Sequence, residues 1–83
     1  MFYVYVIQSI EDTDRFYLGY SADLKRRVAS HNSGENRSTR YTRWRLVYYE
    51  AYLTETSARR RESKLKRNSN MRHYLMARIK EGL

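Results

Sequence analysis

Residues 2–9, FYVYVIQS, constrain the fold most, because aromatic and β-branched side chains occur on both faces of the strand that they predict. Successive side chains of a strand point to opposite sides of a sheet, so this pattern predicts a strand covered on both sides. The chain has 83 residues, and a chain of this size buries roughly 60–65% of its unfolded surface. The sequence therefore predicts one small domain over residues 1–83 with a single core.

Short polar segments separate the next expected elements. A polar turn at residues 10–14 precedes a second strand at 15–20, and the shortness of the turn indicates an antiparallel hairpin. A helix is then predicted over residues 22–31, with Ser21 as its cap. Residues 33–43 form a long polar connection with three arginines.

One more strand and two helices complete the expected fold. The strand covers residues 45–53, and Thr54 or Thr56 caps a helix over about residues 57–67. A third helix follows residues 68–70 and runs to the C-terminus. The order β-β-α-β-α-α predicts an α/β (α+β) domain, in which a small three-stranded antiparallel sheet is flanked by about three helices.

Charge is distributed unevenly along the chain. Residues 1–24 carry one base and four acids, a net charge of −3, whereas residues 25–83 carry sixteen bases and five acids, a net charge of +11. Such an excess of bases is typical of a protein that binds a polyanion, with nucleic acid as the first expectation. Solubility alone is the other interpretation of the same charge.

The absence of cysteine excludes disulfides and thiolate zinc sites. No apolar run approaches the ~18 residues of a membrane span, and no signal-peptide pattern is present. We therefore expect a cytoplasmic protein with no membrane partner.

The cations of the predicted helix at residues 22–31 point in different directions around the helix axis. At about 100° per residue, Arg27 and His31 flank an apolar stripe that contains Leu24, whereas two neighbouring cations point to solvent, Lys25 and Arg26. Arg27 faces the sheet on this interpretation. The alternatives are that Arg27 covers the edge of the core with its stem, and that His31 only favours the negative end of the helix dipole.

The second helix carries a lone carboxylate. Residues 56–80 contain nine bases and a single acid, Glu62, which borders the stripe of Ala58 and Leu65. An i,i+4 ion pair with Lys66 is one interpretation. The other is a divalent-cation site, because Mg²⁺ commonly takes one or two carboxylates together with substrate phosphate oxygens.

Five features in order along the chain resemble the GIY-YIG nuclease family, in particular its small stand-alone, single-domain branch: Tyr3-Val4-Tyr5, Tyr17-Leu18-Gly19, Arg27, His31 and Glu62. The similarity covers about residues 2–66 and is best at DLKRRVASHNSG (23–34) and SARRRESKLK (57–66). The first motif reads Tyr-Val-Tyr where the family name has Gly-Ile-Tyr. Larger relatives carry a further polar residue after the glutamate helix, for which Asn68 and Asn70 are both candidates, and the sequence assigns neither.

The resemblance implies a metal-dependent DNA endonuclease that hydrolyses phosphodiester bonds, selects its substrate by shape and acts in DNA repair. The expected partner is branched, flapped or single-strand-containing DNA, and a protein partner or a homodimer can add specificity. The alternative is a non-catalytic basic module that binds DNA or RNA.

The resemblance also implies roles for individual residues. Tyr5 and Tyr17 lie side by side, and one of them binds or deprotonates the attacking water. Arg27 braces the scissile phosphate, a task suited to a planar cation. Glu62 holds one Mg²⁺ or Mn²⁺, which acts as a Lewis acid. His31 binds the phosphate or the water.

The remaining expected contacts are with the DNA backbone. Gly19 lets a phosphate or another strand approach closely. Cations fix the position of the backbone without reading its sequence, and the candidates are Lys25, Arg26, Arg37, Arg40, Arg43, Arg45, Arg59, Arg60, Arg61 and Lys66. Tyr41 and Trp44 can stack on an unpaired base. For Trp44 the alternative is that it covers the edge of the core.

Overall fold

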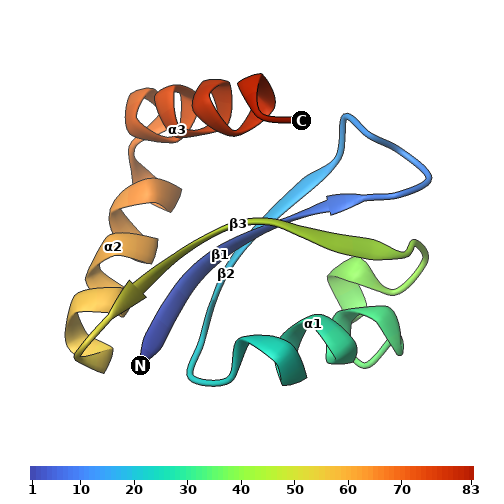
Figure 1. Ribbon diagram of the computed structural model, residues 1–83, viewed down its shortest axis with the longest axis horizontal. Coiled ribbons are helices and arrows are strands. Elements are labelled where there is room, and N and C mark those ends of the chain that lie inside the picture. Colours follow the sequence, from blue (N-terminus) through green and yellow to red (C-terminus); the bar gives the residue numbers. More distant parts are fainter.

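Strand β1 (Phe2–Ser9) is the middle strand of a three-stranded sheet in the computed structural model, which describes residues 1–83. It pairs antiparallel with β2 (Phe16–Ser21) on one side and β3 (Trp44–Tyr52) on the other. Helix α1 (Leu24–Asn32) lies on one side of the sheet, away from α2 (Glu55–Arg67) and α3 (Ser69–Glu81) (Figure 1). The predicted order β-β-α-β-α-α and the antiparallel sheet are confirmed.

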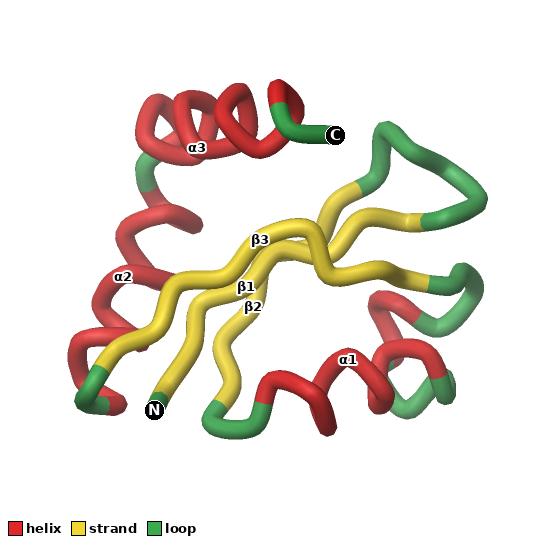
Figure 2. Tube along the Cα trace, viewed as in Figure 1, coloured by secondary structure: helices red, strands yellow, loops and turns green.

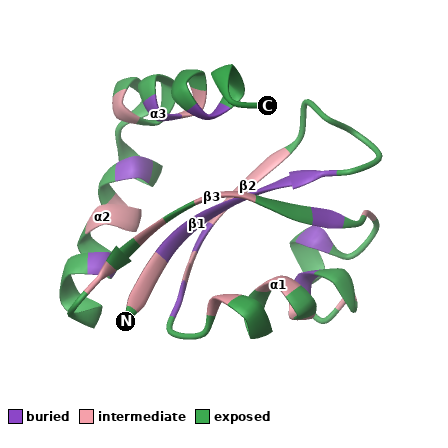
Figure 3. Ribbon diagram, viewed as in Figure 1, coloured by how far each residue is buried: buried purple, intermediate pink, exposed green.

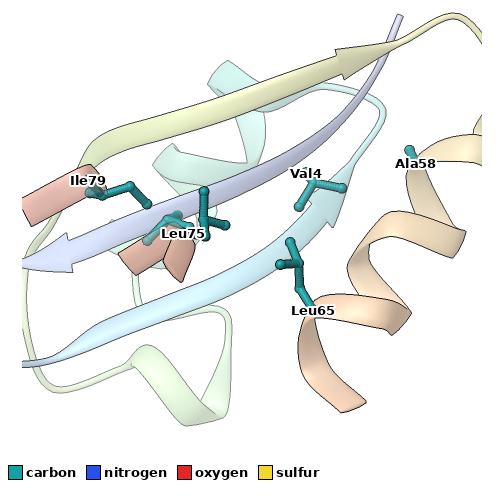
Figure 4. Close-up of a cluster of buried hydrophobic side chains, with 6 residues drawn as sticks. Val4, Ala58, Leu65, Leu75 and Ile79 are labelled. Atoms are coloured by element: carbon teal, nitrogen blue, oxygen red, sulfur yellow. The ribbon is translucent and has the colours of Figure 1, made fainter. Parts of the chain in front are cut away.

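Alternate residues of β1 belong to two different apolar clusters. Val4 and Val6 face α2 and α3, where they belong to one apolar cluster with aliphatic side chains of the two helices (Figure 4): Ala58, Leu65, Leu75 and Ile79. Tyr5 and Ile7 face the opposite side and pack with Trp44. The strand is buried over most of its length (Figure 3), which confirms that it is covered on both sides.

The register of the hairpin places glycine under a tyrosine ring. Tyr5 lies opposite Gly19, and Ile7 lies opposite Tyr17. A side-chain carbon at Gly19 would overlap the hydroxyl of Tyr5. The glycine therefore leaves room for a phenol, whereas the sequence analysis expected room for a phosphate or another strand.

The helix caps differ in part from those expected. Asp23 caps α1 by accepting a hydrogen bond from the Arg26 amide at 3.1 Å, so the assignment of Ser21 is wrong. Ser21 is still the last residue of β2, and its hydroxyl donates to the Asp23 carbonyl at 2.8 Å. Thr54 is the cap of α2.

The break between α2 and α3 is one residue long, where three were expected (Figure 2). Asn68 ends α2 and caps α3 by accepting from the Met71 amide at 3.1 Å. None of the helices is long and apolar enough to cross a bilayer.

The connection before β3 contains a short 3-10 helix, η1 (Arg37–Thr39), which the sequence analysis did not predict. The Trp44 indole donates to the Thr39 carbonyl at 2.8 Å, and the Trp44 amide donates to the Asn32 side chain at 2.6 Å. These bonds fix η1 against the C-terminal end of α1. Thr39 is consequently buried beside that helix end.

Candidate functional site

His31 lies at the centre of a buried polar cluster on the α1 side of the sheet. The last turn of α1 carries it inward until it is 0% exposed. Its Nε2 atom is 2.7 Å from the Tyr5 hydroxyl, and its Nδ1 atom is 2.8 Å from the Thr39 hydroxyl. Both ring nitrogens are therefore hydrogen-bonded, and three separate segments of the chain meet at one imidazole.

The contacts of the Thr39 hydroxyl favour one direction for these bonds. It lies 3.3 Å from the Asn36 carbonyl, which can only accept. Because a hydroxyl has one proton to give, Thr39 donates to Asn36 and accepts from Nδ1–H of His31. The free lone pair is then on Nε2, so Tyr5 donates its proton to His31. The imidazole is held as a neutral acceptor for Tyr5.

Tyr17 also contacts the imidazole of His31. Its ring centroid is 5.0 Å from that of His31 and 6.5 Å from that of Trp44, both in edge-to-face contact. Tyr5 and Tyr17 are on one face of the sheet but diagonal to each other, since Tyr17 pairs with Ile7. Tyr5 is 1% exposed, whereas Tyr17 is only half-buried. Of the two phenols, Tyr17 is the one open to solvent.

Burial and a nearby arginine set the charge states of the cluster. Burial raises the pKa of the Tyr5 hydroxyl well above its ordinary value, and Tyr17 and Glu62 raise it further, while Arg27 opposes them. Burial and the positive charge of Arg27 lower the pKa of His31. At neutral pH Tyr5 is therefore protonated and His31 neutral, in agreement with the hydrogen-bond directions.

Arg27 is exposed in the first turn of α1 and has no carboxylate partner. It borders a hollow that also involves Ser21, Ser30 and Glu35, and Arg26 borders the same hollow. Both arginines are exposed, so the expected difference in their directions is not seen, because long side chains in one turn can reach the same space. Arg27 still differs from Arg26 in being close enough to affect the pKa of Tyr5 and of His31.

Glu62 extends from α2 with a side chain that is 22% exposed. Its one ion pair is with Lys66 at 3.3 Å. The i,i+4 pair that the sequence offered as an alternative to a metal site is therefore present. It is also close enough to raise the pKa of Tyr5. No group of three or more metal-ligating side chains exists in the chain. The donors therefore fit only a cation held by one carboxylate, with water and substrate phosphate as its other ligands.

The expected backbone-binding cations divide into paired and unpaired groups. Five make contacts with acidic or amide side chains: Arg43 with Glu11, Arg45 with Gln8, Arg59 with Glu55, Arg61 with Glu50, and Lys66 with Glu62. Those without an ion pair or side-chain hydrogen bond are exposed: Lys25, Arg26, Arg37, Arg40 and Arg60. Arg61 is held by Glu50 at 2.9 Å. The cations of the unpaired group have no carboxylate partner, so their charge can attract a polyanion.

The aromatic and amide candidates also separate. Tyr41 is 86% exposed, whereas Trp44 is 3% exposed and belongs to the core. Trp44 therefore packs in the core, as the alternative for this residue predicted, and is not free to stack on a base. Asn68 is engaged as a helix cap, and Asn70 is exposed in the first turn of α3. Sequence reasoning missed Thr39 and Asn36, since a polar loop offers no pattern that would single them out.

Comparison with known proteins gives matches over most of the chain. A family described as the GIY-YIG catalytic domain matches residues 1–75. A UPF0213 protein from Streptococcus pyogenes serotype M3 is 38% identical over 69 residues, covering 78% of this chain and 71% of the relative. Another UPF0213 protein, from the archaeon Haloquadratum walsbyi, is 38% identical over 68 residues, covering 77% and 72%. No solved structure matches the chain.

Proposed function

The chain belongs to the GIY-YIG family of endonucleases, and from that premise we propose that it is a metal-dependent endonuclease that cleaves phosphodiester bonds in DNA. The observation that carries this proposal is the 2.7 Å bond from Tyr5 to a neutral, buried His31. Arg27 is near enough to affect the pKa of both groups, and it forms no ion pair with a carboxylate. A proton acceptor next to a free guanidinium suits an attack on a phosphate anion.

The buried pair handles the proton in this proposal. As water attacks phosphorus and the bond to the leaving oxygen breaks, Tyr5 takes the proton from the water and passes its own proton to Nε2 of His31. Thr39 keeps Nδ1 protonated throughout. Because Tyr5 is almost fully buried, it reaches only a water bound in the site. Tyr17, which is open to solvent, orients that water.

Charge is handled by Arg27 and Glu62. Arg27 binds the phosphate oxygens, where a planar guanidinium can make two hydrogen bonds to the developing charge. Glu62 would hold the single Mg²⁺ or Mn²⁺. Such a cation, when bound, supplies Lewis-acid activation and stabilises the leaving oxygen. Lys66 must release Glu62 for this, and it can then bind a backbone phosphate.

Selection of the substrate follows from the unpaired cations. Lys25, Arg37, Arg40 and Arg60 are exposed on different elements and would contact backbone phosphates, which carry no sequence information. We infer that the protein selects branched, flapped or single-strand-containing DNA by shape and acts in repair in the cytoplasm. Additional specificity would come from a protein partner or a homodimer.

A non-catalytic nucleic-acid-binding module is the second candidate, and the pairing of Glu62 with Lys66 favours it. A cleavage assay separates the two. Labelled forks, flaps, junctions, duplex DNA and RNA are incubated with the protein in Mg²⁺ or Mn²⁺. Cutting of at least one DNA structure supports the endonuclease, and tight binding without cutting in either metal contradicts it.

A further inference from the structure

An apolar groove runs between α1 and the sheet on the same face as His31. Its sides are formed by Leu24 and Val28 from the helix, by Tyr3 from β1, and by Leu46 and Tyr49 from β3, around a hollow of about 680 Å³. Leu46 is 38% exposed and Tyr49 is 55% exposed. The rings of Tyr3 and Tyr49 meet edge-to-face with centroids 6.0 Å apart.

The groove is open because α1 packs closely at one end only. At its C-terminal end His31 is fully buried between Tyr5 and Thr39. Leu24 and Val28, nearer the N-terminal end, are only half-buried. The chain therefore leaves aromatic and aliphatic surface uncovered beside its most tightly held polar cluster.

The groove adjoins the hollow bordered by Arg27. Ala22 and Asp23 line both spaces, so the two meet at the start of α1. Lys25 lies at the rim of the groove, and Arg26 and Arg27 border the neighbouring hollow. An occupant that joins an anion to a flat, largely apolar group matches both spaces at once. A nucleotide has this construction.

We propose that the groove binds one unpaired nucleobase of the substrate strand, next to the phosphate held at Arg27, by stacking on Tyr49. The inference rests on the proposed function and adds a base-binding subsite to it. Stacking accepts any base, because every base has a π-face. The subsite thus requires a base free to leave its partner, without requiring a particular sequence.

Binding without cleavage tests this subsite. Single-stranded and forked oligonucleotides carry one abasic residue, which is moved along the strand, and affinity is measured by fluorescence anisotropy in EDTA. For the unaltered protein we expect one position at which the abasic residue weakens binding about 5- to 150-fold, the range for one lost base–aromatic stack. Tyr49→Ala should lose a similar factor on the intact strand and lose its sensitivity to that position. Tyr49→Phe should keep both.

The control is Tyr74→Ala, since Tyr74 is 71% exposed on α3, across the sheet from the groove. Equal losses for Tyr49→Ala and Tyr74→Ala, or no position-specific abasic penalty, would overturn the proposal. Light scattering provides a further check: if Tyr49→Ala turns a dimer into a monomer, the groove is an interface between copies and binds no base. A protein that binds the base but cuts no strand would support the subsite and overturn the hydrolysis.

Discussion

The two faces of the sheet each carry tyrosines, an arginine and one central ionisable group, and they differ in how completely the charges are paired. On the α2 side, Glu50 accepts two hydrogen bonds from Arg61 at 2.9 Å and one each from Tyr48 and Tyr52 at 2.5 Å. Every oxygen of this carboxylate is satisfied by donors from α2 and from its own strand. This cluster ties α2 to β3.

On the α1 side, the central group is neutral and the arginine is free. Tyr5, His31 and Thr39 form a chain of hydrogen bonds without a charge, and Arg27 has no carboxylate within ion-pair distance. The two arginines therefore have opposite uses. Arg61 is paired with the carboxylate of Glu50, whereas Arg27 is free to bind an anion from solution. We infer from this difference that the proposed reaction takes place on the α1 side, where an unpaired guanidinium lies near a proton acceptor.

The largest effect is expected at Glu62, which contributes the only carboxylate near Tyr5. Glu62→Gln should abolish cleavage and leave DNA affinity near that of the unaltered protein, because removing a negative charge does not weaken attraction to a polyanion. Single-turnover cleavage and anisotropy measure the two quantities separately.

Glu55→Gln is the matched control, since Glu55 also forms an i,i+4 pair on α2, with Arg59 at 2.9 Å. It should cleave normally. If both glutamine variants cleave alike, Glu62 is an ordinary surface pair and the metal assignment is wrong.

Arg27 should show the next largest effect. Arg27→Ala is expected to slow single-turnover cleavage about 10²- to 10³-fold, the loss typical of removing one donor to a transition-state oxyanion. Arg27→Lys should restore little, because a point charge does not reproduce the two-pronged guanidinium.

Arg26→Ala separates this role from simple charge. Arg26 borders the same hollow but affects the pKa of neither Tyr5 nor His31. It should therefore lower affinity and leave the cleavage step nearly unchanged. Equal rate losses for Arg26→Ala and Arg27→Ala would mean that both arginines act only through their positive charge. Arg27 would then have no specific role on the α1 side of the sheet.

The Glu50–Arg61 cluster should respond in stability instead of rate. Breaking a buried ion pair costs about 3–5 kcal/mol, and partial exposure of this one reduces the expected loss for Arg61→Ala to about 2–3 kcal/mol. The free energy of unfolding in urea measures it. Arg43→Ala, which breaks the far more exposed pair with Glu11, should leave the unfolding free energy unchanged within error.

The pH dependence of this loss has a definite sign. Burial raises the pKa of Glu50, but hydrogen bonds from Arg61, Tyr48 and Tyr52 outweigh it, so the pKa lies below its ordinary value. A carboxyl with a lowered pKa in the folded state stabilises the fold at neutral pH, and this contribution disappears as the pH falls through the acid range. The difference between Arg61→Ala and the unaltered protein should therefore shrink in acid. A constant difference would assign the effect to packing.

The fold was largely predictable because its main signals are local. The two-faced apolar pattern of residues 2–9 predicts a central strand, and the spacing of His31 from Leu24 places the imidazole toward the sheet, whereas Arg27 is exposed. The site was less predictable, because its main contacts join residues from different segments of the chain. Thr39 reaches His31 from η1, a short helix in a polar loop, and Gly19 is required by a ring fourteen residues earlier, Tyr5. Neither contact leaves a periodic trace in the sequence.

The smallest expected effect is a change in the pKa of His31. It tests whether the charge of Arg27 acts on the buried Tyr5–His31–Thr39 cluster in the protein without substrate. Burial lowers the pKa of His31, and the charge of Arg27 lowers it further. Arg27→Ala removes the second cause, so the pKa of His31 should rise while remaining below its ordinary value because burial persists. NMR titration of the imidazole resonances measures this directly, without substrate or metal. The chain has two histidines, and the exposed His73 on α3 provides a reference resonance on the other face. Arg61→Ala is the matched change on that face and should leave the titration of His31 unchanged. If Arg27→Ala also leaves it unchanged, the guanidinium does not reach the cluster, and the proton-transfer and phosphate-binding roles belong to separate sites.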